Sequence, residues 1–298
     1  MASGSTKSPP RFRRNWLIPV LLLIAILVWL VVLTMPDNKL HVTFLDVGQG
    51  DSILIQTPNH QNILIDGGPD PQKLNLELSK KLPFWDRTID LMISTQPQAD
   101  HITGLVEVLQ RYKVKQVLEP GIPYDSLIHK EWLNLIKDKQ IKDEIASAGQ
   151  EIDLGNGTRL EVLNPPAKLF QETSDDVDNN GVVIKLSWGK VSFLFTADIR
   201  KEAEFELVRH RANLKSTVLK VAHHGSRTST SPQFLAAVDP EIAVISVGGN
   251  NTFGHPSPEV VERLVNRLSE EKVYRTDKKG TIEFITDGER LWIKTEPQ

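Results

Sequence analysis

Two residues that can bind metal or transfer protons stand side by side at positions 100 and 101. Asp100 and His101 follow a short apolar run, residues 89–93, and lead into a segment with helical apolar periodicity, residues 102–109. This pattern predicts a strand, a polar loop and a helix, so both side chains lie where a loop leaves the carboxyl end of a strand. A carboxylate and an imidazole suit a borderline divalent metal. An isolated Asp-His pair is more often two solvated turn residues, so the interpretation needs agreement elsewhere in the chain.

Further aspartates and histidines share this placement after predicted strands. They are Asp66, Asp198, His223, His224 and His255. With each adjacent pair counted once, these residues and the Asp-His pair occupy five positions along the chain, all Asp or His. Such a set fits one rim that holds a metal. Neighbouring glycines allow the backbone to approach closely. The sequence therefore predicts a metal site built from several loops.

The composition is that of an ordinary globular protein. The chain has 298 residues, of which 40% are hydrophobic and 24% charged, enough for one large domain or two small ones. Its net charge of -3 argues against tight non-specific nucleic-acid binding but is compatible with a local phosphate site. It contains no cysteine, which excludes disulfides, thiolate metal ligands and a thiol nucleophile. The lack of cysteine also suits an extracytoplasmic domain.

The N-terminal region predicts a membrane anchor. Residues 1–15 are basic and carry no acidic side chain, and residues 16–33 carry no charge. At about 1.5 Å per residue this run nearly crosses a bilayer core of roughly 30 Å. A buried core helix and a cleaved signal peptide are the alternatives, but the run is longer than a usual signal-peptide core and lacks an Ala-x-Ala-like end. We expect a cytoplasmic tail over 1–15, a transmembrane signal anchor over 16–35, and an extracytoplasmic domain over 37–298 on a single-pass cell-membrane protein.

The remainder alternates short strands with helices. Strands over 40–47, 52–56 and 61–66, separated by glycine turns, predict a meander. A helix over 71–81 follows it. Further helices are expected over 102–112, 126–137, 201–209 and 258–269, and further strands over 159–163, 182–187, 191–196, 216–222 and 242–247. Strands in runs with interspersed helices, in two similar halves, predict sheets sandwiched between helices.

Six motifs, in order along the chain, identify a family resemblance. They are residues 44–52, 64–68, 99–105, 196–198, 219–226 and 254–256. From about residue 39 onward the chain resembles the metallo-β-lactamase-fold hydrolases and, more narrowly, the extracellular hydrolase-like domain of ComEC/Rec2 DNA-uptake (competence) proteins. The resemblance implies an α+β fold, an αββα sandwich with a metal site between its two sheets.

The resemblance also indicates which ligands are present. The general fold uses His-x-His-x-Asp-His at the opening motif, the ComEC branch tends to His-x-Asp-x-Asp-His, and this chain has Gln96 and Gln98 at the first two ligand positions. Glutamine is a poorer ligand for zinc or manganese than imidazole or carboxylate. We therefore expect the family's first metal site to be disabled and the second intact, holding one divalent ion, Zn or Mn. Its expected ligands are Asp100, His101, Asp198 and one of His223 and His224.

Roles for the remaining residues are expectations of the same kind. Strand alternation does not choose between His223 and His224, one of which could bind substrate, fix its neighbour's tautomer or be structural. We assign Asp100 and His255 to catalysis, with His255 facing substrate or standing behind the ligands. Substrate-binding residues are expected to be Asp51, Gly225 and Ser226, although Asp51 could be an ordinary turn residue. Asp66 is expected to support the metal loop, and Asn179 and Asn180 are not counted as ligands.

The expected function is a membrane-anchored, metal-dependent phosphodiesterase or nuclease linked to DNA uptake. With one predicted span the chain cannot itself form a DNA channel, so a separate membrane channel protein would be its partner. One alternative is a degenerate member that binds DNA or a partner without hydrolysis. Another is a hydrolase of an envelope phosphodiester or ester, which the acidic net charge favours over a polynucleotide substrate. The sequence does not indicate an oligomeric state.

Overall fold

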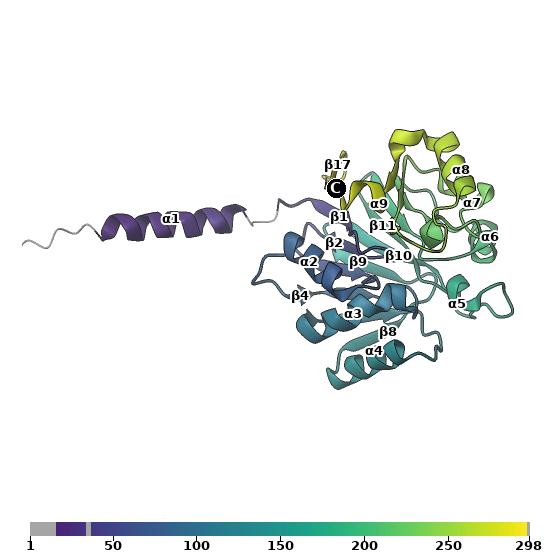
Figure 1. Cartoon of the computed structure of the whole chain (residues 1–298), viewed down its shortest axis with the longest axis horizontal. Coiled ribbons are helices and arrows are strands. Elements are labelled where there is room, and N and C mark those ends of the chain that lie inside the picture. Colours follow the sequence, from purple (N-terminus) through teal and green to yellow (C-terminus); the bar gives the residue numbers. More distant parts are fainter. Residues whose placement is uncertain (1–15, 34–36, 297–298) are drawn as a thin grey trace, which may run out of the picture. The chain divides into compact units, whose positions relative to one another are not determined.

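The described part of the N-terminal unit forms one helix. The computed structural model describes residues 16–33 and 37–296, and the chain divides into two units, residues 1–37 and 38–298. The first unit contains α1 (Leu17–Leu33), drawn in purple in Figure 1. The predicted tail over 1–15 and the last residues of the predicted span, 34 and 35, lie outside the described residues.

The structure does not support the transmembrane helix predicted over 16–35. Helix α1 has 17 residues. Within residues 16–33 and 37–296, no helix combines the length and the apolarity that crossing a membrane requires.

Two mixed sheets form the centre of the second unit. Within residues 38–296 the first sheet has eight strands, in the order β17 (Leu291–Thr295), β16 (Ile282–Thr286), β1 (Leu40–Phe44), β2 (Ile53–Gln56), β3 (Asn62–Ile65), β5 (Leu91–Ile93), β7 (Gln116–Glu119) and β8 (Lys142–Ile145). The second has seven, in the order β15 (Val273–Arg275), β14 (Ile242–Ile245), β13 (Val218–Lys220), β12 (Val191–Phe195), β11 (Val183–Trp188), β10 (Thr158–Asn164) and β9 (Glu151–Gly155). A small parallel pair, β4 (Thr88–Ile89) and β6 (Lys113–Val114), stands apart from both.

Each sheet changes from antiparallel to parallel pairing at one place. In the first sheet, strands from β17 to β3 pair antiparallel, and the parallel part begins with β3 and β5. In the second, strands from β9 to β12 pair antiparallel, and the parallel part begins with β12 and β13. Ligand sites in sheets of this kind lie beyond the carboxyl ends of strands at such changes. These two strand pairs therefore mark where a site is expected.

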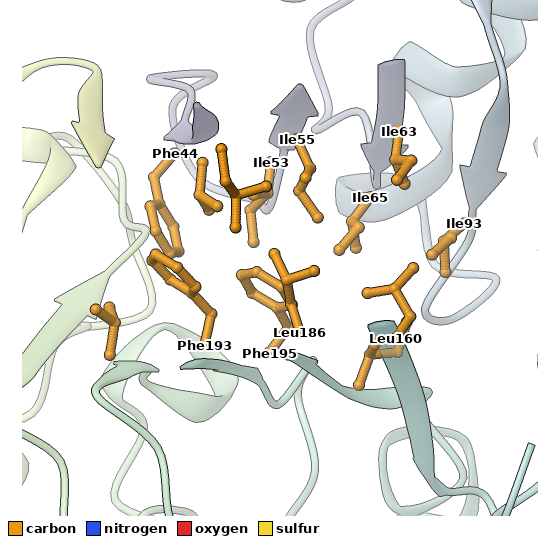
Figure 2. Close-up of a cluster of buried hydrophobic side chains, with 14 of the residues drawn as sticks. Phe44, Ile53, Ile55, Ile63, Ile65, Ile93, Leu160, Leu186, Phe193 and Phe195 are labelled. Carbon is orange, nitrogen blue, oxygen red and sulfur yellow. The ribbon is translucent and has the colours of Figure 1, made fainter. Parts of the chain in front are cut away.

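The two sheets pack face to face through alternating side chains. Ile53 and Ile55 of β2 lie in the apolar layer between the sheets, whereas Leu54 lies on the outer face. In the second sheet Phe193 and Phe195 face the same inner layer from β12 (Figure 2). Neighbouring residues on a strand point to opposite faces. Both faces are buried here, which explains the nearly continuous apolar strands.

Helices cover the outer face of each sheet. The first sheet is covered by α2 (Pro71–Lys81), α3 (Ala99–Arg111) and α4 (Leu127–Asp138), through residues such as Leu74, Ile102 and Trp132. The second is covered by α6 (Lys201–Arg209), α7 (Pro232–Val238) and α8 (Pro258–Leu268). The other short helices are α5 (Asp176–Asn179), α9 (Thr276–Lys279), η1 (Ala222–Gly225) and η2 (Glu270–Lys272). The predicted αββα sandwich is confirmed.

Candidate metal centre

The predicted site residues lie on loops that leave the two marked strand pairs. Asp66 directly follows β3, and Gln96 follows β5. In the other sheet Asp198 follows β12, and the two histidines of η1 follow β13. Positive φ angles occur at Asp66 (56°), Ala197 (46°), His223 (51°) and His224 (52°). A residue other than glycine in this region costs about 1–2 kcal/mol, and such conformations cluster at functional sites.

Four side chains from both sheets converge on one point. These are Asp100, His101, Asp198 and His224, whose ligand atoms all lie within 4.8 Å of one another. The Nε2 atoms of the two histidines lie 3.3–3.8 Å from the nearer carboxylate oxygens of the two aspartates. Donors about 2.1 Å from a shared ion in tetrahedral arrangement stand about 3.4 Å apart. The four residues therefore fit one divalent cation, in donor chemistry as well as in spacing.

Hydrogen bonds behind the histidines turn Nε2 of each toward this point. Nδ1 of His101 lies 2.9 Å from Asp66 Oδ2, and Asp66 also accepts hydrogen bonds from the backbone N–H and the hydroxyl of Thr95. Nδ1 of His224 lies 2.9 Å from the carbonyl oxygen of Ser246, which can only accept. Both Nδ1 atoms therefore carry the proton when the ring is neutral. This leaves the lone pair on Nε2, as in metal-binding histidines. The buried Nε2 of His224 has no hydrogen-bond partner.

A buried lysine orients Asp198. Lys220 is 1% exposed, donates to the carbonyl oxygen of Ala197 at 2.8 Å, and lies 3.4 Å from Asp198 Oδ1. It also forms an ion pair with Asp51. Asp198 therefore presents Oδ1 to the ammonium group and Oδ2 to the histidines. The lysine was missed by the sequence analysis, although a charged residue in a strand expected to be buried was a usable signal.

The charges of the cluster shift the pKa values of its members. Burial alone would lower the pKa of His224, but Asp198 and Asp51 outweigh it and raise the pKa to about 10. The pKa of His101 is likewise raised, against burial, by Asp100, Asp66 and Asp198. Burial would raise the pKa of Asp198, but His224, Lys220 and His101 hold it well below its usual value. Protons on the two histidines thus balance the carboxylates, and a divalent cation could take over that role.

The neighbouring half of the site is held together by protein groups alone. Gln98 donates from Nε2 to Asp178 Oδ1 at 2.9 Å, and Arg200 donates from Nε to Oδ2 of the same residue at 2.7 Å. His223 lies beside them, with Nδ1 3.5 Å from Asp178 and Nε2 4.0 Å from Asp198. The structure thus brings His224, not His223, into the four-residue cluster. Asp178 and Arg200 were not predicted.

The other predicted residues surround the cluster without joining it. Asp51 is buried against Lys220, with one oxygen 3.6 Å from Nδ1 of His224. The His255 ring lies 5.5 Å from that of His223. Its pKa is lowered to about 4 by burial and by the two neighbouring histidines.

Gly225 and Ser226 directly follow His224, at the end of η1. A Cβ at Gly225 would lie 2.6 Å from Pro256, so the glycine permits close approach of the loop that carries His255. The Ser226 hydroxyl lies 2.9 Å from that of Thr228. Substrate roles for Asp51, Gly225 and Ser226 stay predictions.

Asn179 and Asn180 have structural partners. Asn179 Oδ1 accepts from the backbone N–H groups of Arg200 and Ala203 at the start of α6. The Asn180 amide binds the backbone of Phe170. Both contacts support loop geometry.

Comparisons with known proteins agree with this fold. ComE operon protein 3 of Bacillus subtilis (strain 168) is 30% identical over 264 residues, which cover 82% of this chain and 33% of that protein. Competence protein ComA of Neisseria gonorrhoeae is 29% identical over 252 residues, covering 84% of this chain and 33% of the relative. The chain thus spans about a third of the length of these curated relatives. The expected resemblance to the competence proteins is confirmed.

Solved structures and a family model complete the comparison. YhfI of Bacillus subtilis, a metallo-β-lactamase fold protein, matches with a TM-score of 0.52 and 10% identity over 85% of this chain and 99% of its own. Zn(2+)-bound PqqB of Methylobacterium extorquens matches with a TM-score of 0.52 and 10% identity over 81% and 99%. At these identities the likeness shows the fold alone. The model of the metallo-beta-lactamase superfamily matches residues 45–249, and the chain belongs to that superfamily.

Proposed function

We propose that the chain is a metal-dependent hydrolase of phosphodiester bonds that acts on DNA in connection with DNA uptake. The observation that carries the proposal is the buried cluster of two carboxylates and two imidazoles, with both Nε2 atoms turned to one point. The DNA substrate, and a separate membrane channel protein as partner, are proposed because of the competence proteins among the relatives.

Some residues of the chain would bind the metal, and others would hold those residues in place. Asp100, His101, Asp198 and His224 would hold one divalent ion, Zn or Mn. When bound, that ion would supply Lewis acidity for a phosphoryl oxygen and a lowered pKa for a bound water. Asp66 and the Ser246 carbonyl keep the imidazole tautomers fixed, and Lys220 keeps Asp198 ionised and aligned.

The open side of the cluster is where substrate would enter. The Asp100 side chain is 37% exposed, whereas those of the other three ligands are at most 4% exposed. His255, whose ring lies 5.5 Å from that of His223 and 6.4 Å from that of His224, has its pKa lowered to about 4, so it is neutral at pH 7 and could hydrogen-bond a phosphodiester. Asp100 and His255 therefore remain the two residues proposed to contact the reacting groups.

A second candidate function is binding of DNA or a protein partner without hydrolysis. Gln96 and Gln98 favour it, because they stand where the family places two ligands of its first metal. Arg200 and Gln98 already satisfy Asp178 beside them. A third candidate keeps hydrolysis but takes an envelope phosphodiester or ester, and the net charge of -3 favours it.

Metal analysis and hydrolysis assays on the full chain distinguish these candidates. The proposal expects about one Mn²⁺ or Zn²⁺ per chain and hydrolysis of single- or double-stranded DNA, or of a model diester. Asp198→Ala should lower metal affinity and activity by at least about 100-fold, more than the loss of a residue behind the ligands. Bound metal without hydrolysis of any diester, together with salt-dependent DNA binding, would favour the binding function. Hydrolysis of small diesters or esters but not DNA would favour the third.

A further inference from the structure

Gln96 reaches the cluster although its position was expected to be a lost ligand. The residue is 1% exposed and follows β5. Its Nε2 lies 2.8 Å from Nε2 of His101, the atom that faces the other ligands. Its Oε1 is buried and has no hydrogen-bond partner. The amide therefore directs a donor at the lone pair that a metal needs and leaves an acceptor unsatisfied.

Rotating the amide by half a turn removes both problems. The oxygen and nitrogen of a glutamine amide have nearly the same shape, so their assignment follows from their partners. With a cation on Nε2 of His101 no lone pair is left to accept from the amide, and an N–H directed at the cation is repelled. The rotated amide places its carbonyl oxygen 2.8 Å from Nε2 instead. Two ligands at right angles on one ion, each about 2.1 Å from it, stand about 3 Å apart.

The outer end of the Gln96 amide lies beside a glycine. A Cβ at Gly181 would lie 3.2 Å from Gln96 Oε1. The absence of a side chain at Gly181 leaves room for the amide in either orientation.

We infer that Gln96 is a fifth ligand of the centre, through its side-chain carbonyl oxygen. The set then has three oxygen donors, from Asp100, Asp198 and Gln96, and two imidazole nitrogens. Structural and catalytic zinc sites rarely exceed four ligands, whereas carboxylate and carbonyl oxygens suit Mn²⁺. Gln96 should therefore raise the affinity for Mn²⁺ more than that for Zn²⁺. The inference rests on the proposed metal centre but not on the substrate.

Gln98 provides the matched control. It lies two residues away in the same loop, but its Nε2 donates to Asp178 Oδ1 at 2.9 Å, outside the four-residue cluster. The same substitution at the two positions therefore separates loss of a ligand from a general disturbance of the loop.

The test is calorimetric titration of the metal-free full chain with MnCl₂ and, separately, ZnCl₂. Gln96→Leu should weaken Mn²⁺ binding by about tenfold or more, as loss of a group that supports the metal does, and Zn²⁺ binding by about threefold or less. Gln98→Leu should leave both affinities within about twofold of the parent. Gln96→Glu keeps an oxygen donor and adds charge, so it should bind Mn²⁺ at least as tightly as the parent.

The outcomes separate this inference from the proposed function. Equal Mn²⁺ affinity in the parent and a folded Gln96→Leu chain would overturn the fifth ligand alone. A parent chain that binds neither metal would overturn the proposed centre as well. If Gln96→Leu fails to fold by circular dichroism, Gln96→Glu decides, since Mn²⁺ affinity tenfold below that of the parent would overturn the inference.

Discussion

Two adjacent parts of the site satisfy their charges in different ways. In the cluster of Asp100, His101, Asp198 and His224, carboxylates face imidazoles, and Nε2 of His224 has no hydrogen-bond partner. In the group of Gln98, Asp178, Arg200 and His223, a guanidinium and an amide donate directly to the one buried carboxylate. In the first part Lys220 pairs with Asp198, and the remaining charge of the carboxylates favours an added cation, whereas in the second part Arg200 already neutralises Asp178.

This difference shows how the chain could lack the family's first metal, as Gln96 and Gln98 lead us to expect, and keep the fold. A buried carboxylate needs a compensating cation or several donors. Where the family pattern places ligands of a first metal, this chain supplies Arg200 to Asp178 instead. Asp198 stays in the four-residue cluster and does not pair with Arg200. Its Oδ1 lies beside Lys220 and its Oδ2 faces His101 and His224.

The largest expected effect is the loss of the buried ammonium group. Lys220→Met leaves Asp51 and Asp198 buried without their cation, which should lower the free energy of unfolding by about 3–5 kcal/mol. Arg200→Met removes a partly exposed charge from Asp178 and should cost about 1.5–3 kcal/mol. Urea unfolding in the presence of a chelator measures both values. Equal losses would contradict the contrast between the two parts.

A second test concerns a residue that does not face the metal position. Asp66→Asn weakens the acceptor that fixes the His101 tautomer, so metal affinity should fall by about 10–100-fold. Asp178→Asn is the matched change in the neighbouring part. Asp178 faces the imidazole of His223, which lies outside the four-residue cluster. The substitution should change metal affinity by less than about threefold. Titration of each variant with Mn²⁺ gives the comparison, and a larger loss in Asp178→Asn would reverse it.

The pH dependence should differ between the metal-free and the metal-bound protein. The pKa of His224 rises from 6.5 to about 10 in the fold. Its contribution to metal-free stability is therefore complete below about pH 6.5 and is lost as the pH rises toward 10. Metal binding at Nε2 releases that proton, so affinity should increase by about tenfold per pH unit for each proton released.

Thermal unfolding between pH 6.5 and 9 measures the difference directly. With chelator the midpoint should fall over this range, because the charged His224 is lost. At a fixed low concentration of Mn²⁺, the shift in midpoint that the metal produces should grow. Parallel curves with and without Mn²⁺ would show that the cluster releases no proton on binding.

Much of the fold could be predicted because local signals agreed with the packing. Helix α2 begins at Pro71, as expected, with Asp70 accepting hydrogen bonds from two N–H groups of its first turn. Strands β4 and β6 were not distinguished as a separate pair, because two residues each are too short for a periodic pattern, and the strand expected over residues 89–93 joined the end of β4 to β5.

The residues of the candidate metal centre were predictable only in part. Asp100, His101 and Asp198 follow strands, and their placement together is what the pattern indicated. The choice between His223 and His224 could not be made because both adopt left-handed backbone conformations, where strand alternation no longer applies. Asp178 and Arg200 were missed because their pairing joins α5 to the residue before α6, 22 positions along the chain, and has no signal in the local sequence.

The position of the cluster between the sheets has a mechanical consequence. Asp100 and His101 belong to the first sheet's side of the sandwich, and Asp198 and His224 belong to the second. An ion bound by all four would join segments far apart in the sequence and stabilise the folded chain by its binding free energy, because the unfolded chain does not hold the four residues together. In a chain without cysteine, this reversible bond would join the two halves only where the metal is available.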